Sequence, residues 1–257
     1  MAKQKKINIT YYLNKKLKPL HVGKENHYRV YATIGYNRMN TKILFFVHEH
    51  GYLTEDQFEE FFAKKTNQSI NEQVMEFEEK VTKVIRFEAK EIGERYSVSG
   101  IGNRLDHYHQ LMHRELEKHL QKQLHEFSVD QLPGEDLRAI FHDVMMLEDS
   151  YMIIEKKIPS IRKKLPVHLV DRLTTYYQFR GFIRTYDKEV RCLDWLDLPT
   201  QIAFKEFLFT PHQITALFPN EAKHSPFLRL YQQFPLVTEK TPIYLRSMDK
   251  MLSEIIY

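Results

Sequence analysis

The sequence predicts an α+β protein, with a small N-terminal three-stranded antiparallel sheet and one helix, followed by a mainly α-helical region with a long αα-hairpin. Apolar and polar residues alternate over Ile7–Val47, as they do in half-buried strands. Beyond that stretch, apolar residues recur at three- and four-residue steps, as they do on one face of a helix. Only 8 glycines and 10 prolines among 257 residues fit a helix-rich chain, and 42% hydrophobic residues exclude global disorder.

Three strands are expected within the alternating stretch. They span Ile7–Leu13, Tyr28–Tyr36 and Thr41–Val47, and they are joined by a polar loop over 14–26 and a turn over 37–40. Short connections between neighbouring strands favour an antiparallel arrangement. One side of this sheet is expected to carry cations, hydroxyls and aromatic rings but no carboxylate, namely Asn8, Thr10, Tyr12, Arg29, Tyr31, Thr33 and Lys42.

A helix is expected directly after the sheet. Thr54 and Gln57 have the spacing of a capping box, in which two side chains satisfy backbone N–H groups at a helix start. Phe58, Phe61 and Phe62 follow and are expected to cover the apolar side of the sheet. A sheet this small needs such a cover to be stable.

The remainder of the chain is expected to be helical. Two amphipathic helices, over about 69–95 and 104–127, flank the glycine-containing segment 97–103 and predict the αα-hairpin. Further helices are expected over about 135–157 and 167–190, and from Thr-Pro or Ser-Pro pairs at Thr210, Ser225 and Thr241. The expected domains are therefore a basic sheet with one helix (1–66), a helical hairpin (67–130) and a helical C-terminal domain (131–257).

Positive charge is concentrated at the N-terminus. Residues 1–46 contain ten lysines and arginines against Glu25 alone, a net charge of +9, whereas the whole chain carries +4. Such asymmetry points to a polyanionic partner for the first segment. A single cysteine, Cys192, cannot form an internal disulfide and suits a reducing compartment, and no apolar run approaches the roughly 20 residues that a membrane span needs. We therefore expect a cytoplasmic protein without a membrane partner.

The basic sheet predicts an interface with double-stranded DNA. Lysine and arginine neutralise phosphates, and a small sheet can enter the major groove, where side chains reach base edges. Arginine and lysine favour guanine, and asparagine favours adenine. The expected DNA-binding residues are Lys5, Lys6, Tyr12, Lys15, Lys16, Lys18, Arg29, Tyr31, Asn37, Arg38 and Lys42. The alternative is that the lysines only solubilise a small domain.

The segment HYRVYATIGYNRMNTKI extends this interpretation. Its residues Tyr28, Val30, Tyr31, Ile34, Tyr36, Asn37, Thr41 and Lys42 match a pattern common in integrases. Over about residues 5–65 the chain resembles the N-terminal arm-type DNA-binding domain of phage and transposon integrases, which are tyrosine recombinases. The resemblance implies a three-stranded sheet with a helix that places the sheet in the major groove, followed by a helical core-binding domain.

The catalytic equipment of a tyrosine recombinase is not expected in this chain. The resemblance implies an H-x-x-R pair, but none of the thirteen histidines has arginine at the third following position. Tyr257 is a candidate nucleophile, but the sequence does not show the catalytic residues that would have to activate it, and no Walker-type phosphate loop occurs. We therefore expect a non-catalytic protein without a cofactor, which resembles an integrase that lacks its catalytic domain and which acts as an accessory or regulatory factor of a mobile element.

Two further groups leave alternatives open. His109, His113 and Glu117 share a face if one helix carries them, and they are either metal ligands or a hydrated polar face. Arg162, Lys163, Lys164 and Arg172 form either a second phosphate-binding patch or a solvated helix end. We assign no metal to the first group.

A different function class also fits the helices. The chain could be a helical protein–protein interaction module without a nucleic-acid role, in which the sheet only caps the bundle. That alternative expects Arg29 and Lys42 to be buried in ion pairs with the acidic helix over 72–94. The partners expected besides DNA are a recombinase or a second copy of the chain, through the helical region.

Overall fold

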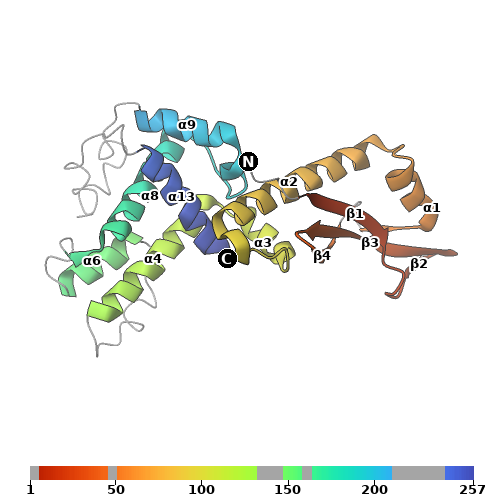
Figure 1. The fold of residues 1–257 in the computed structure, drawn as a ribbon, viewed down its shortest axis with the longest axis horizontal. Helices are drawn as coiled ribbons and strands as arrows, with labels where there is room; N and C mark the ends of the chain where they lie inside the picture. The colour runs from red at the N-terminus through yellow and green to blue at the C-terminus, as the bar shows by residue number, and fades with distance from the viewer. Residues whose placement is uncertain (1–5, 46–50, 132–146, 158–163, 210–240) are drawn as a thin grey trace. The chain divides into compact units, whose positions relative to one another are not determined.

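A computed structural model describes residues 6–45, 51–131, 147–157, 164–209 and 241–257. Contacts group the chain into two compact units, residues 1–107 and 108–257 (Figure 1). An N-terminal antiparallel sheet is followed by a mainly helical region that contains a long helical hairpin, which confirms the predicted α+β class. The three-part domain division with boundaries at 66 and 130 stays a prediction.

Strand β3 (Glu25–Tyr36) is the centre of the sheet. Strands β1 (Ile7–Leu13) and β4 (Met39–Leu44) both pair antiparallel with its C-terminal half. These three strands are the predicted ones, although β3 begins three residues earlier than expected, and β4 begins at Met39 and ends at Leu44 instead of spanning Thr41–Val47. Alternation identified the strands because one face of each is more buried than the other, whereas the tight turn at Asn37 and Arg38 let β3 and β4 pair closer to it than expected.

Two short strands were not predicted. Strand β2 (Leu20–Val22) pairs with Glu25–His27, inside the stretch that was expected to be a loop. Gly23 has φ of +62° at the first position of the two-residue turn that joins them, a conformation that glycine adopts without steric cost. Strand β5 (Tyr52–Leu53) pairs with Tyr28 and Arg29, so the sheet has five strands.

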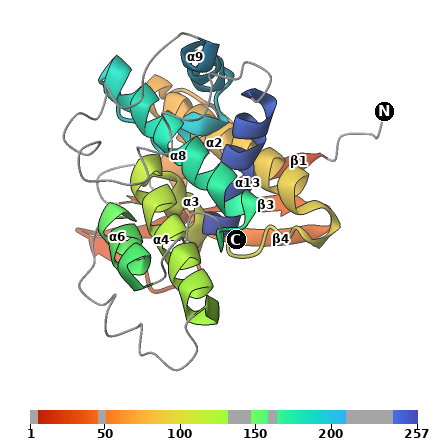
Figure 2. The ribbon, with the colours of Figure 1, turned by 90° about the vertical axis from the view of Figure 1, so that its left-hand side faces the viewer.

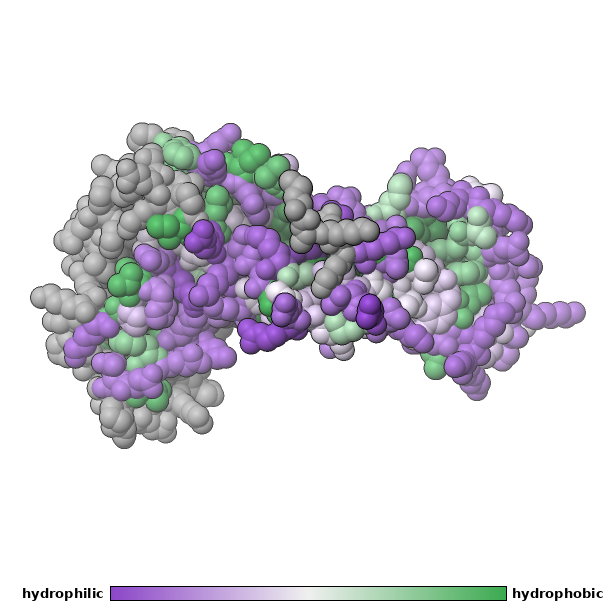
Figure 3. Space-filling model, in the orientation of Figure 1, coloured by the Kyte–Doolittle hydropathy of each residue, from purple (hydrophilic) through white to green (hydrophobic). Residues whose placement is uncertain are grey.

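The apolar side of the sheet forms the core of the first unit. Val30, Ala32 and Leu53 are fully buried there, and phenylalanines of the following helices pack against them. Helix α1 (Glu55–Phe58) begins with the predicted capping box and continues as a π-helical turn, η1 (Glu59–Ala63). Figure 3 shows hydrophobic residues gathered between the sheet and α1. The predicted cover of the sheet is therefore present, and its aromatic members include Phe58, Phe61, Phe62 and Phe77.

The helical hairpin is closed by a buried ion pair. Helix α2 (Gln68–Ile92) ends at Gly93, and α3 (Ile101–Tyr108) follows after a short connection. The Arg104 guanidinium on α3 donates to both carboxylate oxygens of Glu88 on α2, at 3.0 and 3.1 Å, and to the carbonyls of Ser99 and Ser97. Glu88 is only 1% exposed, so Arg104 neutralises a buried carboxylate. The same arginine also holds the connection between α2 and α3 through the Ser97 and Ser99 carbonyls.

The second predicted helix is divided in two. Helix α4 (Met112–Gln131) is separated from α3 by residues 109–111. Backbone groups in the break bond with a distant segment: the Leu193 N–H donates to the Tyr108 carbonyl at 2.9 Å, and the Met112 N–H donates to the Val190 carbonyl at 2.9 Å. Backbone groups that bond with residues 190–193 cannot also make the hydrogen bonds of a continuous helix. The expectation of one helix over 104–127 was therefore wrong at this point.

The second unit is helical in its described parts. Helix α8 (Val167–Tyr186) packs against α4, α9 (Leu198–Phe209) and α13 (Thr241–Ile256), and α6 (Leu147–Lys157) packs against α4 (Figure 2). Rings of Phe179, Phe182, Trp195 and Phe204 form an aromatic cluster within this unit. The helix predicted from Thr241 is α13, whereas the starts at Thr210 and Ser225 lie outside the described residues. No helix of the described residues is long and apolar enough to cross a membrane.

Candidate nucleic-acid interface

The polar side of the N-terminal sheet, here called the outer face, is the candidate site. In register, Tyr12 lies opposite Tyr31, and Thr33 lies between Thr10 and Lys42. The outer face consists of Asn8, Thr10, Tyr12, Arg29, Tyr31, Thr33, Gly35, Asn40, Lys42, Leu44 and Tyr52, and alternation puts Glu25 and His27 on the same side at the start of β3. Apart from Glu25, which lies four residues before Arg29 and 3.8 Å from His27, none of these residues is acidic. The predicted separation of a core side and a polar side is therefore what the strand register and burial show.

Lys42 and two tyrosines form one group on this face. The Lys42 Nζ lies 5.5 Å from the ring centroid of Tyr12, within the range of a cation–π interaction. The Tyr12 ring in turn stacks beside the Tyr31 ring, with centroids 5.9 Å apart and an interplanar angle of 29°. An exposed lysine is thus positioned by aromatic rings and not by a carboxylate.

Arg29 is held by a tyrosine from the unpredicted strand β5. Its Nε donates to the Tyr52 hydroxyl at 2.8 Å, and its Cζ lies 5.3 Å from the Tyr52 ring centroid. This hydrogen bond is the main reason that the pKa of the Arg29 guanidinium is raised. Arg29 is exposed, and no ion pair among the described residues involves it or Lys42. Neither cation is therefore neutralised by a carboxylate of the described residues, and both face solvent.

Asn37 and Arg38 form the two-residue turn between β3 and β4. Both have positive φ, 50° and 66°, which a type I′ hairpin turn requires. Asparagine tolerates this conformation, but glycine is the favoured second residue, and a left-handed conformation costs other residues about 1 kcal/mol. The side chain of Arg38 is exposed at the end of the sheet. An arginine therefore occupies a position where backbone energetics alone favour glycine.

The predicted lysines lie at the edges of the sheet. Lys6, Lys16 and Lys18 are exposed, and Lys15 is exposed but pairs with Glu55, with Nζ and Oε2 2.7 Å apart. An exposed pair of this kind contributes little to stability and can be exchanged for a phosphate contact. Lys5 lies outside the described residues. The described lysines are therefore accessible to a polyanion.

The metal alternative for His109, His113 and Glu117 does not gain support. His109 lies in the break before α4, so the three residues do not share one helix. The Glu117 carboxylate accepts hydrogen bonds from the Tyr176 hydroxyl at 3.0 Å and from the Leu147 N–H at 3.2 Å. Within the described ranges no group of three or more His, Cys, Asp or Glu residues has the arrangement of a metal site.

The second basic patch is also different from the expectation. Arg172 is only 8% exposed, and its Nη2 lies 2.6 Å from the Glu254 carboxylate. It therefore stabilises the contact between α8 and α13 and cannot reach a phosphate backbone. Lys164 is exposed, whereas Arg162 and Lys163 lie outside the described residues. Arg172 was expected in a surface patch because local sequence does not reveal its partner, Glu254, which lies 82 residues later in the chain.

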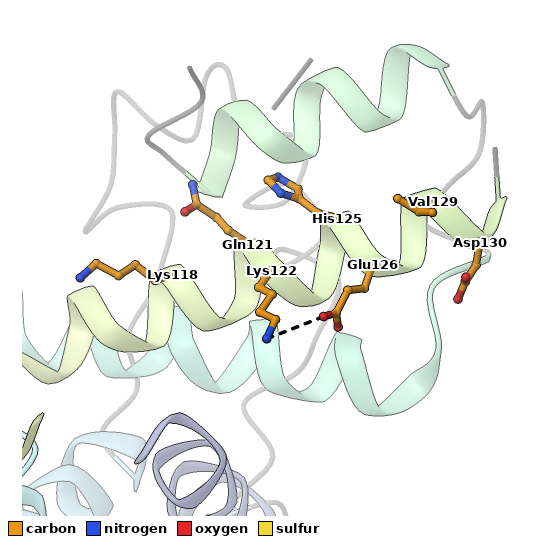
Figure 4. A pocket seen from close by; sticks show the side chains of 7 residues that line it. All are labelled: Lys118, Gln121, Lys122, His125, Glu126, Val129 and Asp130. Carbon is orange, nitrogen blue, oxygen red and sulfur yellow. Dashed lines mark ion pairs between the residues drawn. The ribbon is translucent and has the colours of Figure 1, made fainter. Parts of the chain in front are cut away.

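Two other groups were considered as sites. Burial raises the pKa of the Cys192 thiol to about 12, so this cysteine is not a nucleophile near neutral pH. Figure 4 shows a cavity on the side of α4, lined by Lys118, Gln121, Lys122, His125, Glu126, Val129 and Asp130. Lys122 and Glu126 lie 3.9 Å apart, and Lys118 pairs with Glu115, so this cavity presents mutually neutralised charges and no convergent set of groups.

Sequence reasoning missed two members of the site. Asn40 belongs to the outer face, opposite Gly35. A Cβ added to Gly35 would come within 2.7 Å of the Asn40 side-chain oxygen, so the glycine leaves room for that side chain. Tyr52 was missed because β5 has only two residues and shows no alternation of its own. A usable signal was the order Tyr52, Leu53, Thr54, in which an apolar residue comes just before a helix N-cap. Neighbouring side chains of a strand point to opposite faces, so burial of Leu53 places Tyr52 on the outer face.

Comparisons with protein-family models, with curated proteins and with solved structures found no match. The resemblance to the arm-type domain of integrases therefore stays a prediction, and the proposed function depends on the geometry of the outer face.

Proposed function

We propose that the chain is a non-catalytic DNA-binding protein that contacts double-stranded DNA with the outer face of its N-terminal sheet. The observation that carries the proposal is the pair of exposed cations, Arg29 and Lys42, each held on a tyrosine ring and neither paired with a carboxylate of the described residues. Cations that are ordered by rings are prepared for phosphate or base contacts, because little side-chain entropy remains to be lost on binding.

The arrangement supplies the two kinds of contact that DNA recognition needs. Exposed lysines at the sheet edges, Lys6, Lys16 and Lys18, give affinity through phosphates and counterion release. Arg29, Arg38 and Asn37 present the donors that pair with base edges in the major groove. The integrase resemblance adds a role as an accessory or regulatory factor of a mobile element, in the cytoplasm, with a recombinase or a second copy of the chain bound by the helical region.

The alternative of a protein-interaction module made a different expectation for the same cations. It required Arg29 and Lys42 to be buried in ion pairs with the acidic helix α2. Instead, Arg29 is bonded to Tyr52, Lys42 lies over Tyr12, and both are exposed. This geometry favours the DNA proposal over the alternative.

An anisotropy titration of a labelled DNA duplex at several salt concentrations tests the proposal. We expect wild-type affinity to fall linearly on a log–log scale as salt rises. Charge reversal by Arg29→Glu with Lys42→Glu is expected to weaken binding by about 100-fold, since each base or phosphate contact contributes on the order of tenfold. A matched control reverses two exposed lysines after η1, Lys64→Glu with Lys65→Glu, with the same change in net charge.

The control separates a specific surface from bulk charge. We expect the Lys64 and Lys65 reversal to lower affinity only slightly. Absence of binding at low salt would refute the proposal, and so would an equal loss in the two double variants.

A further inference from the structure

Tyr52 and Arg29 form a unit that is more constrained than the rest of the outer face. Leu53, the neighbour of Tyr52, is 0% exposed in the core, and Thr54 caps the next helix through a hydrogen bond from the Gln57 N–H. Tyr52 is therefore fixed on one side by burial and on the other by a helix start. Its position directly opposite Arg29 in the strand pairing makes it a rigid support for that side chain.

The contacts of Arg29 and Lys42 differ in kind. Lys42 has a ring contact with Tyr12, which leaves its ammonium free to rotate. Arg29 has a ring contact and a 2.8 Å hydrogen bond through Nε, so its planar guanidinium is fixed in direction as well as in place. Donation through Nε leaves the N–H groups of the terminal nitrogens as further donors, and a hydrogen bond with Tyr31 also contributes to the raised pKa of the guanidinium. A planar pair of donors matches O6 and N7 of guanine, whereas a point charge suits a phosphate.

We propose that Arg29 reads a guanine in the major groove and that Tyr52 is the residue that positions Arg29 for this contact. The inference rests on the proposed function, because it names the base that the same surface recognises. Tyr52 itself touches no base in this proposal: its hydroxyl holds Nε and its ring supports the guanidinium. Lys42 contacts phosphate and contributes affinity without sequence discrimination.

The experiment begins with selection of duplexes from a random-sequence library by the full-length wild-type chain. The selected duplex and a scrambled duplex are then titrated with wild-type protein and with the Tyr52→Phe variant, which keeps the ring and removes only the hydroxyl. We expect Tyr52→Phe to lose about threefold to tenfold in affinity for the selected duplex, and to bind the scrambled duplex as wild type does. Tyr186→Phe is the control, because Tyr186 is an exposed tyrosine of the second unit.

A modified base provides a readout that a merely structural role of Tyr52 does not move. Replacing the guanines of the selected site one at a time by 7-deazaguanine removes N7. One such replacement is expected to weaken wild-type binding and to have a much smaller effect on Tyr52→Phe, since both changes weaken the contact between Arg29 and that guanine.

The outcomes distinguish this inference from the proposed function. No binding of any duplex by the wild type defeats the proposed function. Binding without enrichment of a guanine, or equal loss by Tyr52→Phe on both duplexes, overturns the inference and leaves DNA binding intact. A Tyr52→Phe variant that matches wild type on both duplexes overturns it as well.

Discussion

Charged side chains are used in opposite ways on the sheet and between the helices. On the outer face, Arg29 and Lys42 are exposed and lie on tyrosine rings. Between the helices, Arg104 is bonded to the buried Glu88, and Arg172 is bonded to Glu254. Arginine has the same chemistry in both places, but Arg29 faces solvent, whereas Arg104 and Arg172 are largely buried.

The difference indicates what each cation can be used for. An arginine that neutralises a buried carboxylate is needed by the fold, because removing it leaves a charge in a low-dielectric interior. An arginine that rests on an exposed ring contributes little to stability, because exposed cation–π contacts are worth about 0.5–1 kcal/mol. The sheet cations, Arg29 and Lys42, are therefore the ones that a partner can bind without destabilising the fold.

Arg104→Ala is the variant that separates the two groups most strongly. It removes the arginine that neutralises the buried Glu88 carboxylate, so we expect the free energy of unfolding to fall by about 3–5 kcal/mol. Denaturant titration of the full chain measures this loss. Arg29→Ala, on the sheet, is expected to change it by less than about 1 kcal/mol.

A double variant tests whether the loss of charge neutralisation at Glu88 is the cause. Glu88→Leu with Arg104→Leu removes both charges and is expected to be clearly more stable than Arg104→Ala alone. Equal stability of the single and double variants would show that packing, and not the ion pair, dominates at this site.

Three histidines on α4 make the second unit sensitive to acid. Burial is the main reason that the pKa values of His113, His119 and His125 are lowered from the ordinary 6.5. The Nδ1 of His113 has no hydrogen-bond partner in the described part of the chain, so charging this ring is especially unfavourable. Neighbouring carboxylates, Glu117 for His113 and Glu254 for His119, oppose the effect of burial but do not reverse it.

The sign of the pH dependence follows from these directions. The unfolded chain takes up protons on these histidines as pH falls through about 6.5, whereas the folded chain takes them up only at lower pH. We expect stability to be retained above pH 6.5 and to fall steadily below it, until the folded-state pKa values are passed. Denaturant titrations between pH 7.5 and 5 measure this fall.

A matched substitution identifies the residues responsible. Replacing His113, His119 and His125 together by glutamine is expected to flatten the profile between pH 6.5 and 5. His168→Gln changes an exposed histidine of the same unit and is expected to leave the profile as it is in wild type. A profile that is unchanged in the triple variant would assign the acid sensitivity to other groups.

Regular patterns in the sequence were sufficient to predict strands β1, β3 and β4 and the helix that covers them. The boundaries of β1 and the capping box of Thr54 and Gln57 followed from alternation and from a three-residue spacing, both of which are local. The long-range features were not accessible in this way. The break before α4 depends on hydrogen bonds with residues 190–193, and the burial of Arg172 depends on Glu254.

The candidate site shows the same limit. The main polar outer-face members of β1, β3 and β4, apart from Asn40, were predicted, because strand periodicity places side chains on faces without knowledge of distant partners. Tyr52 was not predicted, because its role comes from a pairing with Arg29 across 23 residues. Periodicity identified the face, and only the register of β5 identified the support for its arginine.

Arg38→Gly tests whether the turn arginine is kept for binding. Glycine removes the cost of the left-handed conformation at φ of 66°, so we expect the free energy of unfolding to rise by about 0.5–1 kcal/mol. Affinity for duplex DNA is expected to fall by several-fold in the same variant, because a cation is lost from the end of the sheet. Opposite changes in stability and affinity support a functional arginine, and a change in stability alone contradicts it.

The smallest expected effect concerns a single phosphate contact. Lys16 is an exposed lysine beside the sheet, whereas Lys64 is an exposed lysine after η1 that lies 3.5 Å from Glu59. If Lys16 neutralises one phosphate, Lys16→Gln removes one counterion-release contact and lowers the slope of log affinity against log salt by about 0.9. The loss should be equal for all duplex sequences, unlike the loss in Tyr52→Phe, because phosphate contacts carry no base information. Lys64→Gln has the same change in charge and is expected to leave the slope unchanged, so a slope that shifts equally in both variants would assign the salt dependence to net charge and not to the sheet.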